Sequence, residues 1–319
     1  MSQLFLSCDL TGSTNFKQSV SPNTPWQKVF LSFYREFPQR VAMTQVKLGT
    51  EHLNFDLWKP VGDELIYSCE VASEEDVYHA VRTWMRAMSA YEAESLDDTS
   101  MGTKGGAFIA TFPGPDSRSS VPRNPKVESS DADVVILNRD AHKGGLAHGK
   151  YLYDYFGPSI DTGFRILGRC SSRYFTLSVE VALAMLGRAM TPGAGREDFP
   201  VDDLLLLDFV ELKGVWKGRK YPIVAIDTEC SDPVHKAYAA FEHRSSAEEL
   251  HALCEACYTA KDWPCKLFLP DSANGHFTTE PEDPLATYAA TTSEGAETAA
   301  SEAEGGGEPL SEDAPLGDH

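Results

Sequence analysis

The sequence has no long apolar run, and this absence excludes the simplest kind of membrane protein. Among its 319 residues, no stretch approaches the roughly 20 apolar residues that a helix needs to cross a bilayer. The N-terminus has no basic region followed by an apolar core, so we expect no secretory signal peptide. Seven cysteines without a tight framework are typical of free thiols in a reducing compartment. We therefore expect a cytoplasmic protein without a membrane partner.

A surplus of positive charge is also missing. The net charge is −20, and residues 280–319 hold eleven acidic residues and no Lys or Arg, which leaves −9 for the first 279 residues. Because proteins that bind nucleic acids need clustered Lys and Arg, we expect no nucleic-acid partner. The glycine-rich lysine motif of P-loop ATPases is absent too, so the sequence gives no support for that class of enzyme.

The most informative stretch is residues 5–17, FLSCDLTGSTNFK. It begins as a buried strand and delivers the carboxylate of Asp9 at its end. Gly12 then allows the backbone to pass close to a ligand, and Ser13 and Thr14 can cap a following helix. A strand, an acid and a turn rich in N–H groups could hold phosphate and metal, although an ordinary structural turn has the same pattern.

Periodicity along the chain predicts a mixed α+β fold. We expect strands at residues 5–9, 53–61, 64–71, 104–112, 133–137, 175–179, 204–212 and 220–226. We expect helices at residues 26–37, 73–93, 161–169, 180–186 and 247–258. Their order predicts a ferredoxin-like split βαββαβ core, with the last two strands as an extra β-hairpin.

Composition divides the chain into three parts. Residues 1–228 hold the predicted α+β domain, in which residues 113–150 form an insertion or mobile loop that begins rich in Pro, Ser, Gly and Arg. Residues 229–275 form a helical extension. Residues 276–319 form an acidic tail that we expect to be disordered, since it cannot bury enough apolar surface to fold.

A second acid, Asp63, lies at the tip of the hairpin formed by residues 53–71. In a split βαβ fold the first strand lies beside this hairpin, which would bring Asp63 close to Asp9. Two carboxylates that hold two divalent ions suit phosphoryl transfer, and oxygen ligands favour Mg²⁺ or Mn²⁺. Each acid alone could equally be a structural turn residue.

Four segments resemble the motifs of class III nucleotidyl cyclases. Residues 5–14 are similar to the first metal motif, and residues 59–64, KPVGDE, to the Lys-x-x-Gly-Asp hairpin. Residues 154–165, DYFGPSIDTGFR, are similar to the Asp-x-x-Gly-x-x-x-Asn-x-x-x-Arg signature. Residues 211–215, ELKGV, are similar to the closing Leu-Lys-Gly strand. The four segments occur in the family's order.

The resemblance implies a role for each candidate residue. Two Mg²⁺ or Mn²⁺ ions per site would be held by Asp9, Asp63 and the carbonyl of Leu10. The remaining roles follow the family's motifs: phosphates at the amides of Thr11, Gly12, Ser13 and Thr14, the base at Lys59 and Asp154, and the α-phosphate at Arg165. Lys213, with Lys217 as the alternative, could reach the triphosphate. Asp161 stands where the family normally has an Asn that orients the ribose.

The resemblance also implies partners and a product. Class III catalytic domains form head-to-tail homodimers whose two active sites each take residues from both subunits. Residues 155–165 are more specifically similar to pyrimidine cyclases of bacterial anti-phage (Pycsar) systems, which make cyclic UMP or cyclic CMP for a separate effector protein. This favours UTP over CTP as the nucleoside triphosphate. The alternatives are an adenylate cyclase, an inactive nucleotide-binding or dimerisation module, and a polymerase-palm-like nucleotidyltransferase.

Overall fold

The computed structural model describes most of the chain. The described residues are 1–18, 25–97, 99–124, 126, 128, 132–143, 145–190, 204–239, 241, 245–286 and 288. The predicted acidic tail therefore lies outside the described residues except at 276–286 and 288. Among the described helices, none is both long and apolar enough to cross a bilayer.

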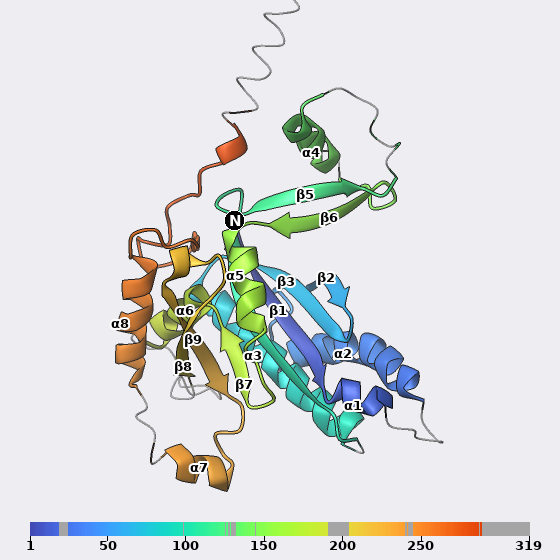
Figure 1. Ribbon diagram of the computed structural model, residues 1–319, viewed down its shortest axis with the longest axis vertical. Helices are drawn as coiled ribbons and strands as arrows, with labels where there is room; N and C mark the ends of the chain where they lie inside the picture. Colours follow the sequence, from blue (N-terminus) through green and yellow to red (C-terminus); the bar gives the residue numbers. More distant parts are fainter. Residues whose placement is uncertain are drawn as a thin grey trace, which may run out of the picture.

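Seven strands form one mostly antiparallel sheet in the order β2-β3-β1-β4-β7-β9-β8, and only β4 and β7 pair in parallel (Figure 1). The strands of this sheet are β1 (Ser2–Thr11), β2 (Asp56–Val61), β3 (Glu64–Val71), β4 (Gly102–Thr111), β7 (Tyr174–Leu177), β8 (Leu204–Glu211) and β9 (Lys220–Asp227). The mixed α+β class is confirmed. As expected, β1 lies beside the β2–β3 hairpin, with Asp9 opposite Glu64.

The described α-helices vary from 6 to 23 residues in length. They are α1 (Ser13–Gln18), α2 (Trp26–Leu48), α3 (Glu74–Tyr91), α4 (Val134–His142), α5 (Pro158–Leu167), α6 (Val179–Met190), α7 (Pro233–Ala239) and α8 (Ala247–Tyr258), with a π-helical turn at Glu92–Leu96 and a 3₁₀ turn at Trp216–Gly218. The predicted start of α3 is confirmed, because the Ser73 hydroxyl accepts a hydrogen bond from the Asp76 amide at 3.1 Å.

The two faces of the sheet are covered differently. Leu4, Leu6, Cys8 and Leu10 of β1 point into the larger core, with α2, α3 and α6. Phe5, on the opposite face, belongs to a smaller cluster that α5 covers. This alternation follows from the two-residue repeat of a strand, and it places Asp9 on the same face as Phe5.

A two-stranded arm stands apart from the main sheet (Figure 1). Its strands are β5 (Ser117–Pro122) and β6 (Tyr151–Phe156), which pair antiparallel. The interpretation of residues 113–127 as a mobile loop is therefore wrong over the length of β5, because β6 supplies hydrogen-bond partners that local composition cannot reveal.

Two predicted elements differ from the structure. Residues 133–137 were expected to form a strand, but α4 begins there, because the Asp133 carboxylate accepts a hydrogen bond from the Val135 amide at 2.8 Å and caps the helix. The helix predicted at 161–169 begins earlier, at Pro158, whose fixed φ suits a first helical position.

Candidate functional site

The two predicted metal acids lie close together. The β2–β3 turn carries Asp63 to the end of β1, where the Leu10 amide donates to the Asp63 carbonyl oxygen at 3.4 Å. Burial raises the pKa of Asp9, and the nearby negative charge of Asp63 adds to this rise. The strand register thus joins two acids that lie far apart in sequence.

Two further charged side chains, which the sequence did not single out, flank Asp9. Lys104 lies opposite it on β4, with Nζ 3.1 Å from Asp9 Oδ2, and opposes the rise of the Asp9 pKa. Glu64 lies opposite it on β3, and burial followed by the charge of Asp9 raises the pKa of Glu64. Lys17 lies more loosely beside Asp63, at 4.0 Å from Oδ2. The only sequence signal was a charged residue at the start of each flanking strand.

The donor set around Asp9 suits a hard divalent cation. Two carboxylates and the Leu10 carbonyl are oxygen ligands of the kind that Mg²⁺ and Mn²⁺ accept. Across the described parts of the chain, no group of three or more His, Cys, Asp or Glu side chains could hold a metal ion. An ion at Asp9 and Asp63 would therefore complete its shell with water and substrate phosphate oxygens, as Mg²⁺ commonly does.

The turn after Asp9 is tight and partly engaged. Gly12 has a φ of 74°, which favours glycine, and its carbonyl accepts from the Phe16 amide at 2.9 Å as α1 begins. Thr11 Oγ1 accepts from the Gly102 amide at 3.1 Å, which ties the turn to β4. Ser13 is buried, whereas Thr14 is exposed. The Thr11 side chain is thus structural.

Lys59 and Asp154, the predicted base-reading residues, form an ion pair. Lys59 Nζ lies 2.8 Å from Asp154 Oδ1 and 2.9 Å from Oδ2. The indole of Trp58 donates to the same Oδ1 at 2.9 Å. Lys59 and Asp154 are about one third exposed, which leaves the pair accessible to a ligand. The β5–β6 arm and the hairpin thus meet at Asp154.

Helix α5 carries Arg165 and Asp161 one turn apart. Arg165 Nη1 donates to the Asp161 carbonyl and lies 4.0 Å from its carboxylate, which is largely exposed. Gly163, between them, packs directly on Phe108 of β4. A Cβ atom at Gly214 would lie 4.0 Å from Arg165 Nη2, so the loop that also carries the exposed Lys213 approaches this arginine.

The carboxylates and the base-reading pair lie at different places on one sheet face. Trp58 packs on Phe5, with ring centroids 4.8 Å apart. Lys59 pairs with Ile66 of β3, which pairs with Ser7 of β1, so Lys59 lies two residues before Asp9 in register and two strands, about 10 Å, to the side. One chain therefore holds the two halves of the predicted site apart.

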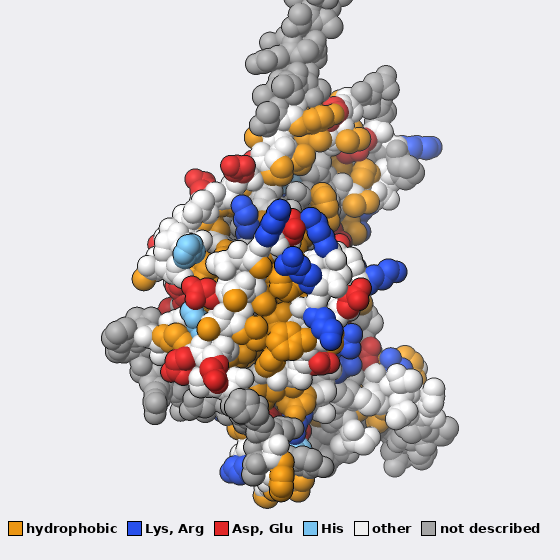
Figure 2. Space-filling model, turned by 60° about the vertical axis from the view of Figure 1, so that its left-hand side comes forward, with side chains coloured by type: hydrophobic (Ala, Val, Ile, Leu, Met, Phe, Trp, Pro, Cys, Tyr) orange, Lys and Arg blue, Asp and Glu red, His pale blue; other side chains and the backbone are white. Residues whose placement is uncertain are grey.

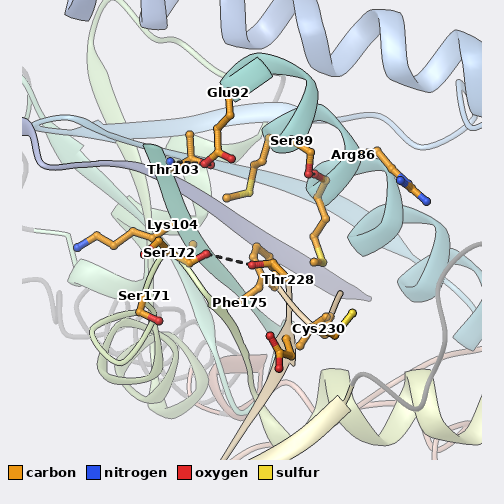
Figure 3. Close-up of a pocket in the computed structure, with 15 residues that line it drawn as sticks. Arg86, Ser89, Glu92, Thr103, Lys104, Ser171, Ser172, Phe175, Thr228 and Cys230 are labelled. Carbon is orange, nitrogen blue, oxygen red and sulfur yellow. Dashed lines mark hydrogen bonds between the residues drawn. The ribbon is translucent and has the colours of Figure 1, made fainter. Parts of the chain in front are cut away.

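A cavity of about 190 Å³ is lined by Thr103, Lys104 and Gly105 near the start of β4, but it does not form the candidate site (Figure 3). None of the predicted site residues lines it, and Lys104 alone connects it with Asp9. In Figure 3 the Lys104 side chain extends away from the other lining residues. Thr228 donates to the Ser172 carbonyl at 3.0 Å across one side of this cavity. We therefore place the candidate chemistry on the sheet face that carries Asp9 and Phe5, at the end of β1.

One face of the molecule shows how charge is distributed. In Figure 2, Lys and Arg side chains gather along the upper and right parts of the face, around exposed hydrophobic side chains, and Asp and Glu lie both at the left and among the basic side chains. The basic side chains seen there alternate with apolar and acidic ones rather than forming an unbroken stripe.

Comparisons with known proteins give only distant similarity. No protein-family model matches the sequence, and no curated protein matches it. Among solved structures, the chain is similar to the adenylyl cyclase CyaB from P. aeruginosa, at 11% identity over 70% of this chain and 93% of that one, with a TM-score of 0.45. It is also similar to the guanylate cyclase domain of RhGC from Catenaria anguillulae in complex with GTP, at 12% identity over 71% and 96%, with a TM-score of 0.42. An adenylate/guanylate cyclase/hydrolase from Silicibacter pomeroyi gives 11% identity over 72% and 98%, with a TM-score of 0.40. These structural neighbours are adenylyl and guanylyl cyclases, but the similarity is too low to assign this chain an activity.

Proposed function

We propose that this protein is a nucleotidyl cyclase that converts a nucleoside triphosphate into a 3′,5′-cyclic nucleotide and pyrophosphate. The observation that carries the proposal is the meeting of Asp9 and Asp63 at the junction of β1 and the hairpin. The four sequence motifs support it, because they supply the paired carboxylates and the basic residues that phosphoryl transfer needs. In this reaction the 3′-hydroxyl oxygen bonds to the α-phosphorus, the bond to pyrophosphate breaks, and the hydroxyl proton is released.

The residues of the chain divide the work. Asp9, Asp63 and the Leu10 carbonyl would hold two Mg²⁺ or Mn²⁺ ions, which when bound lower the pKa of the attacking hydroxyl and neutralise the triphosphate. Lys59 and Asp154 would orient the base. The planar guanidinium of Arg165 suits the charge that develops at the α-phosphate, and Lys213 could reach the other phosphates.

Separation of the two halves within one chain supports a shared site. We propose a head-to-tail homodimer in which Asp9 and Asp63 of one subunit face the partner subunit's Arg165. Two inactive variants test this arrangement, Asp9→Ala and Arg165→Ala, each expected to remain dimeric by light scattering. Mixed dimers should recover part of the activity, since one of their two sites keeps both residues. Confirmed mixed dimers without recovery would contradict the shared site.

The finer part of the proposal concerns the substrate and the setting. We propose a pyrimidine nucleotide, UTP before CTP, in a cytoplasmic anti-phage system whose product is bound by a separate effector protein. This part is supported only by the resemblance of residues 155–165. Adenylate cyclase activity remains the alternative for the same site.

Product analysis tests the activity itself. Purified protein is incubated with each of the four nucleoside triphosphates and Mn²⁺, and mass spectrometry measures cyclic nucleotide and pyrophosphate. We expect product from the wild type and none from Asp63→Asn, which keeps the shape of the side chain but removes its charge. Primer extension would instead indicate a palm-like nucleotidyltransferase.

An inactive nucleotide-binding module is the second candidate. Asp161 favours it, because an acid placed where the family has an Asn would repel a triphosphate. The ion pair between Lys104 and Asp9 favours it as well, since it already neutralises one metal acid. Nucleotide binding without any cyclic product would establish this module.

A further inference from the structure

We propose that a second cavity, between α4, the β5–β6 arm and residues 283–286, binds a small organic anion with an apolar body. Its volume is about 780 Å³, and small-molecule sites commonly have about 300–1,000 Å³. The residues predicted to bind metal or nucleotide are not among the described residues that line it. The inference therefore goes beyond the proposed cyclase reaction and does not depend on it.

One face of α4 borders this cavity. The helix contributes Val135, Asn138, Arg139 and His142, whose spacing of three, one and three residues keeps them on one side of a helix. Over residues 134–142 no side chain is buried, so the protein itself does not pack against this face. Asn138 fastens the helix to the arm, because its Oδ1 accepts a hydrogen bond from the Ser120 amide at 2.7 Å. The rest of the face is left for a ligand.

Apolar side chains line the cavity opposite α4. Met1 and Phe112 border it from the end of the main sheet, and Leu285 borders it from the C-terminal segment. Val135 of α4 adds apolar surface on the other side. A ligand with an apolar body would remove this surface from water, which favours binding.

Arg118 gives the cavity a positive charge that no acid compensates. Its Nη2 lies 2.9 Å from Met1 Sδ, a weak acceptor, and its Cζ lies 5.7 Å from the centroid of the Phe112 ring. In the described part of the chain, no carboxylate forms an ion pair with Arg118. Burial, and after it the charge of Arg118, lower the pKa of His142, as expected beside an unpaired cation.

The other charged residues of the cavity leave this excess in place. Arg139 Nε lies 3.8 Å from Asp140 Oδ1, but Lys143 Nζ lies closer to the same oxygen, at 2.8 Å. Asp283 is the one acid among the described residues that line the cavity, and its Oδ1 already accepts a hydrogen bond from the Leu285 amide at 2.9 Å. Two arginines thus outnumber one acid, and the cavity should attract an anion.

The chemistry of the lining defines the class of ligand. Guanidinium groups bind the planar or tetrahedral oxyanions of carboxylates and phosphates with paired hydrogen bonds. An inorganic anion alone would leave the apolar lining in water, and a neutral apolar molecule would leave the arginines unpaired. Arg118 lies opposite Tyr155 of β6, next to Asp154. An anion bound here would therefore contact the arm that carries a predicted base-reading residue.

Two fluorescent probes of matched shape test the site on the full chain. Anilinonaphthalene sulfonate has an apolar ring body and one anionic group, whereas phenylnaphthylamine has the same ring body without the charge. Both become brighter in apolar surroundings, so titration of the protein measures binding. We expect the wild type to bind one sulfonate probe, roughly tenfold more tightly than the neutral probe. Arg118→Gln should weaken the sulfonate probe by roughly the same factor and leave the neutral probe unchanged.

Arg123→Gln is the matched control. Arg123 follows β5 on the same arm and donates from Nε to the His148 carbonyl at 2.9 Å, but it is not among the residues that line the cavity. This variant should bind both probes as the wild type does. Equal weakening of the sulfonate probe by both variants would overturn the inference, because general surface charge would then explain it.

Two further results would also overturn the inference. One is an Arg118→Gln variant that folds, as judged by circular dichroism, and binds the sulfonate probe as tightly as the wild type. The other is a wild type without saturable binding, as expected if the eight acidic residues of 289–319 filled the cavity instead.

These outcomes are independent of the cyclase proposal, because probe binding is measured without turnover. Cyclic product from the wild type, together with unchanged binding by Arg118→Gln, would refute the anion site and keep the cyclase. Binding that Arg118→Gln weakens, without any cyclic product, would support the anion site and refute the cyclase.

Discussion

The contact between Gly163 of α5 and Phe108 of β4 can be tested by adding one methyl group. A Cβ atom on Gly163 would lie 2.3 to 2.5 Å from three atoms of the Phe108 ring, about 1 Å closer than van der Waals contact. Phe108 cannot retreat, because it is 1% exposed and stacked on Phe5 with the ring centroids 4.9 Å apart. In Gly163→Ala the helix itself must therefore move away from the sheet.

Two opposing terms set the size of the effect. Overpacking of a core contact costs about 1–3 kcal/mol. Replacing Gly by Ala inside a helix stabilises by about 1 kcal/mol. We therefore expect Gly163→Ala to lower the free energy of unfolding by up to about 2 kcal/mol. Because α5 also carries Arg165 and Asp161, the same variant should lose nucleotide turnover.

Gly187→Ala in α6 is the matched control. A Cβ atom there would meet nothing within 4 Å, so this variant gains the helix term alone and should be more stable by about 0.5–1 kcal/mol. Urea unfolding followed by circular dichroism measures both variants, and the difference between them isolates the packing cost. If Gly163→Ala were as stable as Gly187→Ala, the close packing of α5 on β4 would be wrong.

Three further variants test other contacts. Lys104→Met removes the cation beside Asp9, so the pKa of Asp9 should rise further. A ¹³C NMR titration of the Asp9 carboxyl carbon measures this pKa, and a lower pKa in the variant would contradict the ion pair. Burial raises the pKa of Glu180, so its ionisation costs the folded state stability as pH rises above the unfolded value of 4.5. The free energy of unfolding of Glu180→Gln, relative to that of the wild type, should therefore be larger at pH 8 than at pH 5 in urea unfolding. The same difference between the two proteins at both pH values would refute this. Arg173 lies 3.1 and 2.8 Å from the two oxygens of the buried Asp227, so Arg173→Met should cost about 3 kcal/mol in the same assay, and a loss below about 1 kcal/mol would show that the pair contributes little.

Several features of the fold and site were determined locally and could be predicted from sequence. The apolar run before Asp9 predicts a strand, which is β1. The Gly-Asp turn at 62–63 closes a hairpin because glycine supplies the backbone conformation that the turn requires. The capping pattern at Ser73 fixed the start of α3 in the same way. Such signals work because their interacting groups lie within a few residues of each other.

Other features depended on partners that lie far away in sequence. Lys104 and Glu64 reach Asp9 only through strand register, and β5 exists because β6 pairs with it. Likewise, α2 continues past Pro38 to Leu48, because the side chain of Val41 in its second half is buried in the main core.

The same limit applies to the base-reading pair. The resemblance of the sequence motifs predicted that Lys59 and Asp154 act together on the base. Only the packing of the β5–β6 arm beside the hairpin brought the Trp58 indole to the Asp154 carboxylate. Hydrogen-bond capacity is decided by every donor within reach, and those donors come from separate elements. The sequence therefore predicted which residues would carry the chemistry, and the tertiary structure decided which of them contact each other, because those contacts join separate elements.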